Sequence, residues 1–453
     1  MKTYLKCIPV AALLLFAACS SCSKDSEEGG SGETGKLPEG KELYRPEEFS
    51  GQNWWSDTCD YSYNRMDYTD NLVIYWQKGF GENLANPPEL EGKSMKVDLD
   101  NLKRKLETFY TYFRDELQFV KPGSLSEKYR MMVMIMYSLE GTAYGGTYDN
   151  KIGAFWAAPN RLQDEKLNAV AHELGHSFQL QIIADGQGEA WGGNGIYEMA
   201  SQWMLWQVNP DWMKDENYHW VAFKELTHKA FLHVDNIYHS PYVLEYWGVK
   251  HGLPIIAEMF RQGLKGEDPV ITYKRMNEMT QEQFNDEMMD VYLHLVNLDY
   301  DRVYDLTRQW ANSFAPFKAN LKEDGSGWLQ VVKEACPENY GFNAIKLKVP
   351  EAGQVVKVDF KGLSEATGYN MINADKAGWR YGFVGVTTEG KSVLGTVGRD
   401  AEGQISFTTP SDVKLSYLWL VVMGAPTEHW MNSSTEVDAQ WPYKIKISGT
   451  DIE

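Results

Sequence analysis

Cysteine is scarce in this chain, with five residues among 453. Cys7 lies in the N-terminal leader segment, and Cys19 and Cys22 follow it closely, so only Cys59 and Cys336 remain for the folded part. Neither has a second cysteine or a histidine at zinc-finger spacing, which argues against a structural zinc site of that kind. These two thiols could pair in an oxidising compartment or stay buried and separate, and the sequence leaves both possibilities open.

Positive charge is also in short supply. The chain has 44 Lys and Arg against 63 Asp and Glu, which gives a formal net charge of −19 at pH 7. Such acidity argues against nucleic acid or an anionic membrane surface as a partner. The length of 453 residues exceeds what one hydrophobic core usually organises, so we expect two domains.

Long apolar runs are missing, apart from one short stretch near the N-terminus. Lys2 and Lys6 precede an apolar segment at residues 8–18. This segment is too short to cross a bilayer, which requires about 20 apolar residues. The pattern of basic residues, apolar stretch and small residues predicts that residues 1–18 form a signal peptide for export.

Residues 16–19 (FAAC) resemble a bacterial lipobox, in which cleavage leaves an acylated cysteine at the new N-terminus. The resemblance implies lipid anchoring to a membrane through Cys19, rather than through Cys22. Residues 19–43 are rich in Ser, Gly and charged residues and are expected to form a flexible tether. Within it, residues 24–28 (KDSEE) resemble the acidic surface-export signals of Bacteroidetes lipoproteins. We therefore expect an exported outer-membrane or cell-surface lipoprotein, on the periplasmic or the extracellular face.

Residues 44–325 carry the pattern of a mixed α and β domain. Apolar runs at 71–76, 130–137 and 152–157 have the length and content of strands, and residues 99–119 have the periodicity of an amphipathic helix. Helices are predicted to dominate from residue 164 to about residue 314. The region between the second and third strands is rich in glycine and is predicted to be a turn: Gly141, Gly145 and Gly146.

Residues 326–453 have a different pattern. Short β-branched and aromatic runs alternate with Gly, Asp and Pro turn signals, which predicts a small all-β sandwich domain. The runs lie at residues 344–349, 355–360, 381–386, 415–423 and 443–447. The predicted fold class is therefore an α+β domain followed by a β-sandwich.

One motif carries chemistry. His172, Glu173 and His176 form a His-Glu-x-x-His pattern inside residues 164–180, whose apolar side chains recur with helical periodicity. Histidines four apart project from the same side of a helix and can share one metal ion, and Glu173 can then activate a metal-bound water. By chance, this pattern would occur in such a chain with a probability on the order of 0.01 to 0.02.

A catalytic zinc ion takes three protein ligands, so a third must lie elsewhere in the chain. Glu198 is the best candidate, because it lies in a second segment with helical periodicity, and rigid elements place ligands better than loops do. Glu189, in the glycine-rich loop between the two helices, is the competitor. Gln202 could accept a hydrogen bond from a ligand imidazole, more weakly than a carboxylate would.

The combination of His172, Glu173 and His176 with Glu198 on a second helix resembles the gluzincin class of zinc metallopeptidases. The resemblance implies a zincin-like catalytic domain, with zinc bound by His172, His176 and Glu198 and with Glu173 as general base. The spacing is also similar to that of enhancin-like peptidases, some of which cleave heavily O-glycosylated proteins. The whole arrangement resembles an uncharacterised family of secreted Bacteroidetes zincin-like lipoproteins.

Peptide hydrolysis also requires a donor for the developing oxyanion. We expect Tyr238 or His239 in this role, on a loop before a helix that Pro241 would start. His233 and Tyr246 are the alternatives.

The sequence thus predicts a zinc metallopeptidase acting on extracellular proteins, including glycoproteins. The alternative is a surface lipoprotein that binds glycans or glycoproteins on a zincin scaffold without turnover. Zinc-dependent hydrolysis of a bond other than the peptide bond is a third possibility.

Overall fold

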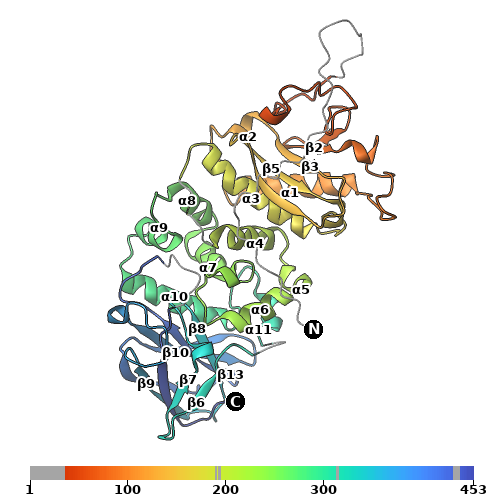
Figure 1. The fold of residues 1–453 in the computed structure, drawn as a ribbon. Coiled ribbons are helices and arrows are strands. Elements are labelled where there is room, and N and C mark those ends of the chain that lie inside the picture. The colour runs from red at the N-terminus through yellow and green to blue at the C-terminus, as the bar shows by residue number, and fades with distance from the viewer. Residues whose placement is uncertain (1–35, 189–190, 192–194, 313–315, 432–438) are drawn as a thin grey trace, which may run out of the picture.

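The computed structural model describes residues 36–188, 191, 195–312, 316–431 and 439–453. Figure 1 shows a sheet-containing part at one end of the molecule, a helical part in the middle and a β-rich part at the other end. Within the described residues, none of the helices combines the length and the apolar content that crossing a membrane requires. The lipidation candidate Cys19 and the proposed signal peptide lie outside the described residues.

The N-terminal part is built on a five-stranded sheet of order β1-β2-β3-β5-β4. β2, β3 and β5 run parallel, and β1 and β4 flank them as antiparallel strands. The strands predicted at 71–76, 130–137 and 152–157 are confirmed, and every residue of β2 and β3 is buried, as their apolar content requires. The bounds are β1 Met66–Tyr68, β2 Leu72–Trp76, β3 Met131–Ile135, β4 Ala143–Tyr148 and β5 Ile152–Ala157.

The prediction of a turn at the glycine-rich segment is wrong, because Gly145 and Gly146 lie inside the edge strand β4. Glycine is needed at one of these positions by close packing. A Cβ atom on Gly145 would lie 2.2 Å from the carbonyl oxygen of Glu173 and 2.6 Å from Cβ of His176. On Gly146 it would meet only the Trp156 ring, at 3.5 Å. The edge strand therefore lies directly against the helix that carries the metal motif.

Helices pack on one face of this sheet and continue into the middle of the molecule (Figure 1). The helix predicted over 99–119 is present but ends at Asp115. The motif helix begins at Asn168 rather than at residue 164, because Leu167 has a left-handed backbone (φ 57°). The bounds are α1 Leu99–Asp115, α2 Leu125–Lys128, α3 Asn168–Ala184, α4 Ile196–Val208, α5 Trp212–Asp215, α6 Tyr218–Leu226, α7 Tyr242–His251, α8 Ile255–Gln262, α9 Pro269–Met276, α10 Gln281–Leu295 and α11 Tyr304–Ala311.

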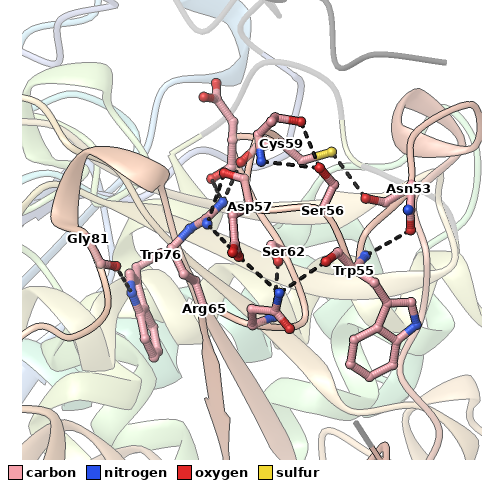
Figure 2. Close-up of polar contacts among 12 residues, drawn as sticks. Asn53, Trp55, Ser56, Asp57, Cys59, Ser62, Arg65, Trp76 and Gly81 are labelled. Carbon is pink, nitrogen blue, oxygen red and sulfur yellow. Dashed lines mark hydrogen bonds and ion pairs between the residues drawn. The ribbon is translucent and has the colours of Figure 1, made fainter. Parts of the chain in front are cut away.

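The segment that precedes β1 covers the other face of the sheet. Trp54 packs edge to face on Tyr75 of β2, with ring centroids 5.2 Å apart. Arg65 holds this segment from within: its buried guanidinium donates to the backbone carbonyl oxygens of Asp57 (3.3 Å) and Cys59 and pairs with the Asp57 carboxylate at 3.6 Å. Figure 2 shows these contacts gathered around the Arg65 side chain. A buried charge that is bonded in this way orders the loop around it.

The C-terminal part is a sandwich of two sheets, of orders β11-β10-β13-β8 and β12-β9-β14-β7-β6. All five predicted runs are strands, which confirms the all-β sandwich, and the sheet and helices before it confirm the predicted α+β class. Four further short or polar strands, β6, β7, β11 and β12, were missed. The bounds are β6 Leu321–Glu323, β7 Leu329–Val331, β8 Phe342–Leu347, β9 Val355–Gly362, β10 Trp379–Thr387, β11 Ser392–Gly398, β12 Glu402–Thr408, β13 Leu415–Gly424 and β14 Tyr443–Ser448.

Cys336 is a free thiol buried in the core between the two sheets of the sandwich. The possible disulfide between Cys59 and Cys336 is therefore not formed. The division of the chain between residues 325 and 326 stays a prediction, because the first sheet of the sandwich packs directly on the helical part. Tyr292 of α10 stacks on Phe342 of β8 with ring centroids 4.1 Å apart.

Candidate metal centre

The helices α3 and α4 hold the predicted metal residues and lie unusually close together. A Cβ atom on Gly175 of α3 would lie 2.9 Å from Oγ and 3.3 Å from Cα of Ser201 on α4. This contact explains why a glycine, which costs a helix about 1 kcal/mol relative to alanine, stands inside the motif. On its other side α3 is fixed to the sheet, because Ser177 donates to the carbonyl oxygen of Ala154 in β5 at 2.8 Å.

Three side-chain atoms converge between the two helices. Nε2 of His172 and Nε2 of His176 lie 3.1 Å apart, and Oε2 of Glu198 lies 3.0 Å from the first and 3.1 Å from the second. Ligand atoms about 2.0–2.2 Å from one tetrahedral metal ion would be separated by about 3.3–3.6 Å, so this triangle is slightly tighter than a loaded site. Glu198 thus occupies the position expected of the third ligand. Its competitor Glu189 lies outside the described residues.

Glu173 lies beside this triangle. Its carboxylate and ligand nitrogens of His172 and His176 are all within 4.8 Å of one another, and the residue is half-buried. A carboxylate at this place can reach a water molecule bound at the centre of the triangle. The donor set of two imidazoles and one carboxylate, with a second carboxylate nearby, matches zinc in a site with an open fourth position.

Both imidazoles are oriented by a glutamine. Nδ1 of His172 lies 2.8 Å from Oε1 of Gln202, and Nδ1 of His176 lies 3.2 Å from Oε1 of Gln179. A carbonyl oxygen only accepts, so both Nδ1 atoms carry a proton, and a bound metal ion would take the lone pairs of both Nε2 atoms. Gln202 was expected in this role. Gln179 was missed, although its position three residues after His176 on the same helix could have indicated it.

The electrostatics of the triangle favour an ionised carboxylate. Burial raises the pKa of Glu198. Hydrogen bonds and charge interactions with His172 and His176 lower it by a larger amount, so the pKa lies well below the ordinary value. Burial lowers the pKa of His176. The hydrogen bonds to Glu198 and Gln179 and the charges of Glu198 and Glu173 together have the larger effect and raise the pKa above the ordinary value. A buried carboxylate that depends on neighbouring positive charge is a strong site for a cation.

The two oxyanion candidates take different places. The backbone carbonyl oxygen of Tyr238 accepts from Nε2 of Gln202 at 3.3 Å, and its partly exposed ring lies 6.1 Å, centroid to centroid, from the ring of His172. His239 instead bonds His219 through its Nδ1 atom, at 2.7 Å. Burial and the neighbouring His219 lower the pKa of His239 to about 4, so its imidazole is neutral at neutral pH.

The two alternatives are engaged elsewhere. His233 caps a short 3-10 helix, where its Nδ1 accepts from the backbone N–H of Asp235 at 3.0 Å. The hydroxyl of Tyr246 donates to Asp290 on α10. His219, which links to both Gln202 and His239, is a residue that sequence reasoning missed, because nothing in its local sequence marks it.

A model of a protein family of unknown function, DUF6055, matches residues 36–453 of this chain, which therefore belongs to that family. A search of curated proteins found no match. Among solved structures, the chain is similar to the M60 catalytic domain of ZmpC from Clostridium perfringens, in complex with the sialyl T antigen. That likeness has 14% identity and a TM-score of 0.32, and covers 83% of this chain and 69% of the other.

Two further solved structures match. The ZmpB metallopeptidase from Clostridium perfringens is 13% identical with a TM-score of 0.32, over 83% of this chain and 69% of the other. A mutant of a family 29 carbohydrate-binding module is 12% identical with a TM-score of 0.18, over 29% of this chain and 75% of the other.

Proposed function

We propose that this member of the DUF6055 family is a zinc-dependent metallopeptidase. The observation that carries the proposal is the triangle of His172, His176 and Glu198, with separations of 3.0–3.1 Å, beside the carboxylate of Glu173. Zinc bound by these three side chains would supply a polarised water nucleophile and a Lewis acid.

The protein's own residues supply the proton transfers. The Glu173 carboxylate takes a proton from the attacking water and then delivers it to the leaving nitrogen of the cleaved peptide bond. Gln202 and Gln179 hold the ligand imidazoles in one tautomer throughout. Tyr238 is a candidate to donate to the developing oxyanion, because its ring lies beside that of His172.

The edge of the sheet suggests how a peptide is held. Among the described strands, β4 pairs only with β5, so its other edge has free backbone donors and acceptors next to α3. An extended peptide can add to such an edge as a further strand. This arrangement supports a peptide substrate over other hydrolysable groups, because it recognises the polypeptide backbone itself.

We propose further that the substrates include glycoproteins. Tyr144 of β4 is 46% exposed and stacks on Trp156 with ring planes 12° apart and centroids separated by 4.9 Å. A flat, supported ring on the edge strand is suited to stacking against a sugar attached to the bound peptide. Lipid anchoring through Cys19 would place the enzyme on a membrane, with access to secreted or surface proteins.

The decisive experiment measures zinc content and peptide cleavage in the wild type and in Glu173→Gln. We expect the variant to keep zinc and to lose activity by at least about 100-fold, because the amide cannot accept the proton. Glu165→Gln, at an exposed site shortly before α3, is the matched control and should behave as the wild type. Wild-type-like cleavage by Glu173→Gln would overturn the proposed mechanism. A zinc-loaded wild type that binds glycopeptides without cutting them would support the non-catalytic alternative.

Glycan dependence is tested with one peptide in glycosylated and bare forms. Tyr144→Ala should raise KM for the glycopeptide several-fold and leave KM for the bare peptide nearly unchanged. An equal change for both substrates would show that Tyr144 contacts the peptide or supports the strand instead of a sugar.

A further inference from the structure

The side chain of Gln202 joins His172 of the candidate metal centre to two histidines outside the triangle, His219 and His239. Its Oε1 atom lies 2.8 Å from Nδ1 of His172, and its Nε2 atom lies 3.2 Å from Nε2 of His219. Nδ1 of His219 in turn lies 2.7 Å from Nδ1 of His239. Four side chains from α3, α4, α6 and the loop before α7 thus form one continuous chain of hydrogen bonds.

The direction of every bond in this chain follows from its first member. His172 can offer Nε2 to a metal ion only when Nδ1 carries the proton, so Oε1 of Gln202 must face it. The amide nitrogen of Gln202 then faces His219 and donates, which requires a lone pair on Nε2 of His219. The proton of His219 must lie on Nδ1, where it is donated to Nδ1 of His239. The proton of neutral His239 is left on its Nε2 atom.

Glu216 is the carboxylate that competes with Gln202 for Nε2 of His219. Its Oε2 atom lies 3.5 Å away, compared with 3.2 Å for Nε2 of Gln202, and it also accepts from the indole N–H of Trp212 at 2.9 Å. The rings of Trp212 and Tyr218 flank His219, with centroids at 5.4 Å and 4.3 Å. These contacts fix the plane of the ring, and the hydrogen bonds to Gln202 and His239 then determine its tautomer.

We propose that His219 is a positioning residue that keeps the amide of Gln202 and the ring of His239 in one orientation each, with Nε2–H of His239 held as a neutral donor for the substrate. Among the residues that the structure describes, no hydrogen bond involves Nε2 of His239, and the residue is only partly buried. The donor is therefore available. This inference rests on the proposed peptidase function for the use of the donor, but not for the tautomers themselves.

The chain of hydrogen bonds from His172 through Gln202 and His219 to His239, called the relay below, also explains why a glutamine stands at position 202. An aspartate or glutamate would accept from His172 at least as well, but it could not donate to His219. An unprotonated carboxylate oxygen would instead face the lone pair of His219, which would then have to take a proton on Nε2. Its Nδ1 atom would lose the proton donated to His239, unless the ring became positively charged. Glutamine is the residue that serves both neighbours while both histidines stay neutral.

The first test reads the tautomers directly. Nitrogen-15 NMR of the zinc-loaded full-length protein distinguishes protonated from unprotonated ring nitrogens, and the chain has nine histidines to assign. We expect Nδ1–H for His219 and Nε2–H for His239 in the wild type. In Gln202→Glu, His219 should gain a proton on Nε2. The opposite tautomer of His219 or His239 in the wild type, or an unchanged His219 in Gln202→Glu, would overturn the proposal.

The second test uses two substitutions of His219. Phenylalanine keeps the ring packing and removes both hydrogen bonds, whereas glutamine can accept from Gln202 and donate to His239. We expect His219→Phe to leave His239 as a mixture of tautomers and to lower kcat about 10-fold or more with little change in KM. His219→Gln should recover much of kcat and the single tautomer, and a glutamine variant no better than phenylalanine would contradict the relay.

The two proposals fail in different ways. If the wild type cleaves no peptide but shows the expected tautomers, then the peptidase function fails and the relay stands. If the wild type cleaves peptides and His219→Phe matches it in kcat and in the tautomer of His239, then the relay fails and the peptidase function stands.

Discussion

The α3–α4 helix pair and the contact between α10 and the β-sandwich are both buried, but they are buried with opposite chemistry. Between α3 and α4 the interior holds polar side chains, including Gln179, Ser201 and Gln202, and each has a hydrogen-bond partner. The sandwich contact is formed mainly by fully buried apolar residues. Polar burial of this kind orients a site, whereas apolar burial supplies most of the stability.

The largest effect should follow from placing a charge in the apolar contact. Val421 of β13 is fully buried in the core that the sandwich shares with the helices. Val421→Asp should lower the free energy of unfolding by about 4 kcal/mol or more, because the carboxylate finds no partner there. Urea unfolding measures the change, and Ser416→Asp, at an exposed site on the same strand, is the control. Near-equal stability of both variants would mean that the sandwich is not held by this contact.

The next largest effect is expected in the α3–α4 helix pair, where a substitution should lower zinc affinity and leave the fold unchanged. Glu198→Gln keeps the shape of the side chain and removes the only charge among the three ligands. We expect zinc affinity to fall by at least about 100-fold, since even outer partners of ligands cost 10- to 100-fold when lost. Competition with a chromophoric chelator gives the affinity, and circular dichroism checks the helices. Unchanged affinity would exclude Glu198 as a ligand.

Two neighbouring glycines of β4 offer an internally matched pair. Gly145→Ala places a Cβ atom 2.2 Å from the carbonyl oxygen of Glu173, so strand and helix must separate. We expect a loss of about 1–3 kcal/mol in stability together with reduced activity. Gly146→Ala meets only an ordinary contact at 3.5 Å and should change little. Similar melting temperatures and rates for the two variants would contradict the close packing of β4 on α3.

The smallest effect is expected at the polar rim of the sandwich contact. His294 of α10 pairs with Asp299, Nδ1 to Oδ2, at 3.5 Å, and this hydrogen bond raises the pKa of His294 despite opposing burial. The same bond is the largest cause that lowers the pKa of Asp299.

The sign of the pH dependence follows from these shifts. A raised histidine pKa stabilises the fold below the unfolded value of about 6.5, and the stabilisation is lost as pH rises through the folded pKa. The lowered pKa of Asp299 gives stabilisation that is lost as pH falls below about 4. His294→Gln should therefore cost under about 1 kcal/mol at pH 5.5 and less at pH 8, by urea midpoints. A larger cost at pH 8 would contradict this assignment.

Much of the fold could be predicted, because its main helices and strands have clear patterns in the local sequence. β3 is apolar at every position and α1 has clear helical periodicity, so both were found, with small errors at their ends. β4 was not found, since its glycines have the local signature of a turn. Gly145 is required by the nearby backbone of α3 at Glu173. That residue is distant in the sequence, so no local pattern could predict the contact.

The sequence by itself determined that His172 and His176 lie on one side of α3, because a spacing of four residues is close to one helical turn of 3.6 residues wherever that helix lies. It also indicated Glu198, through the periodicity of α4. Only the tertiary structure decided that Gln202 pairs with His172, that Gln179 orients His176, and that His219 connects Gln202 to His239. Hydrogen bonds between side chains on different elements depend on distances of a few tenths of an ångström, and packing sets these distances.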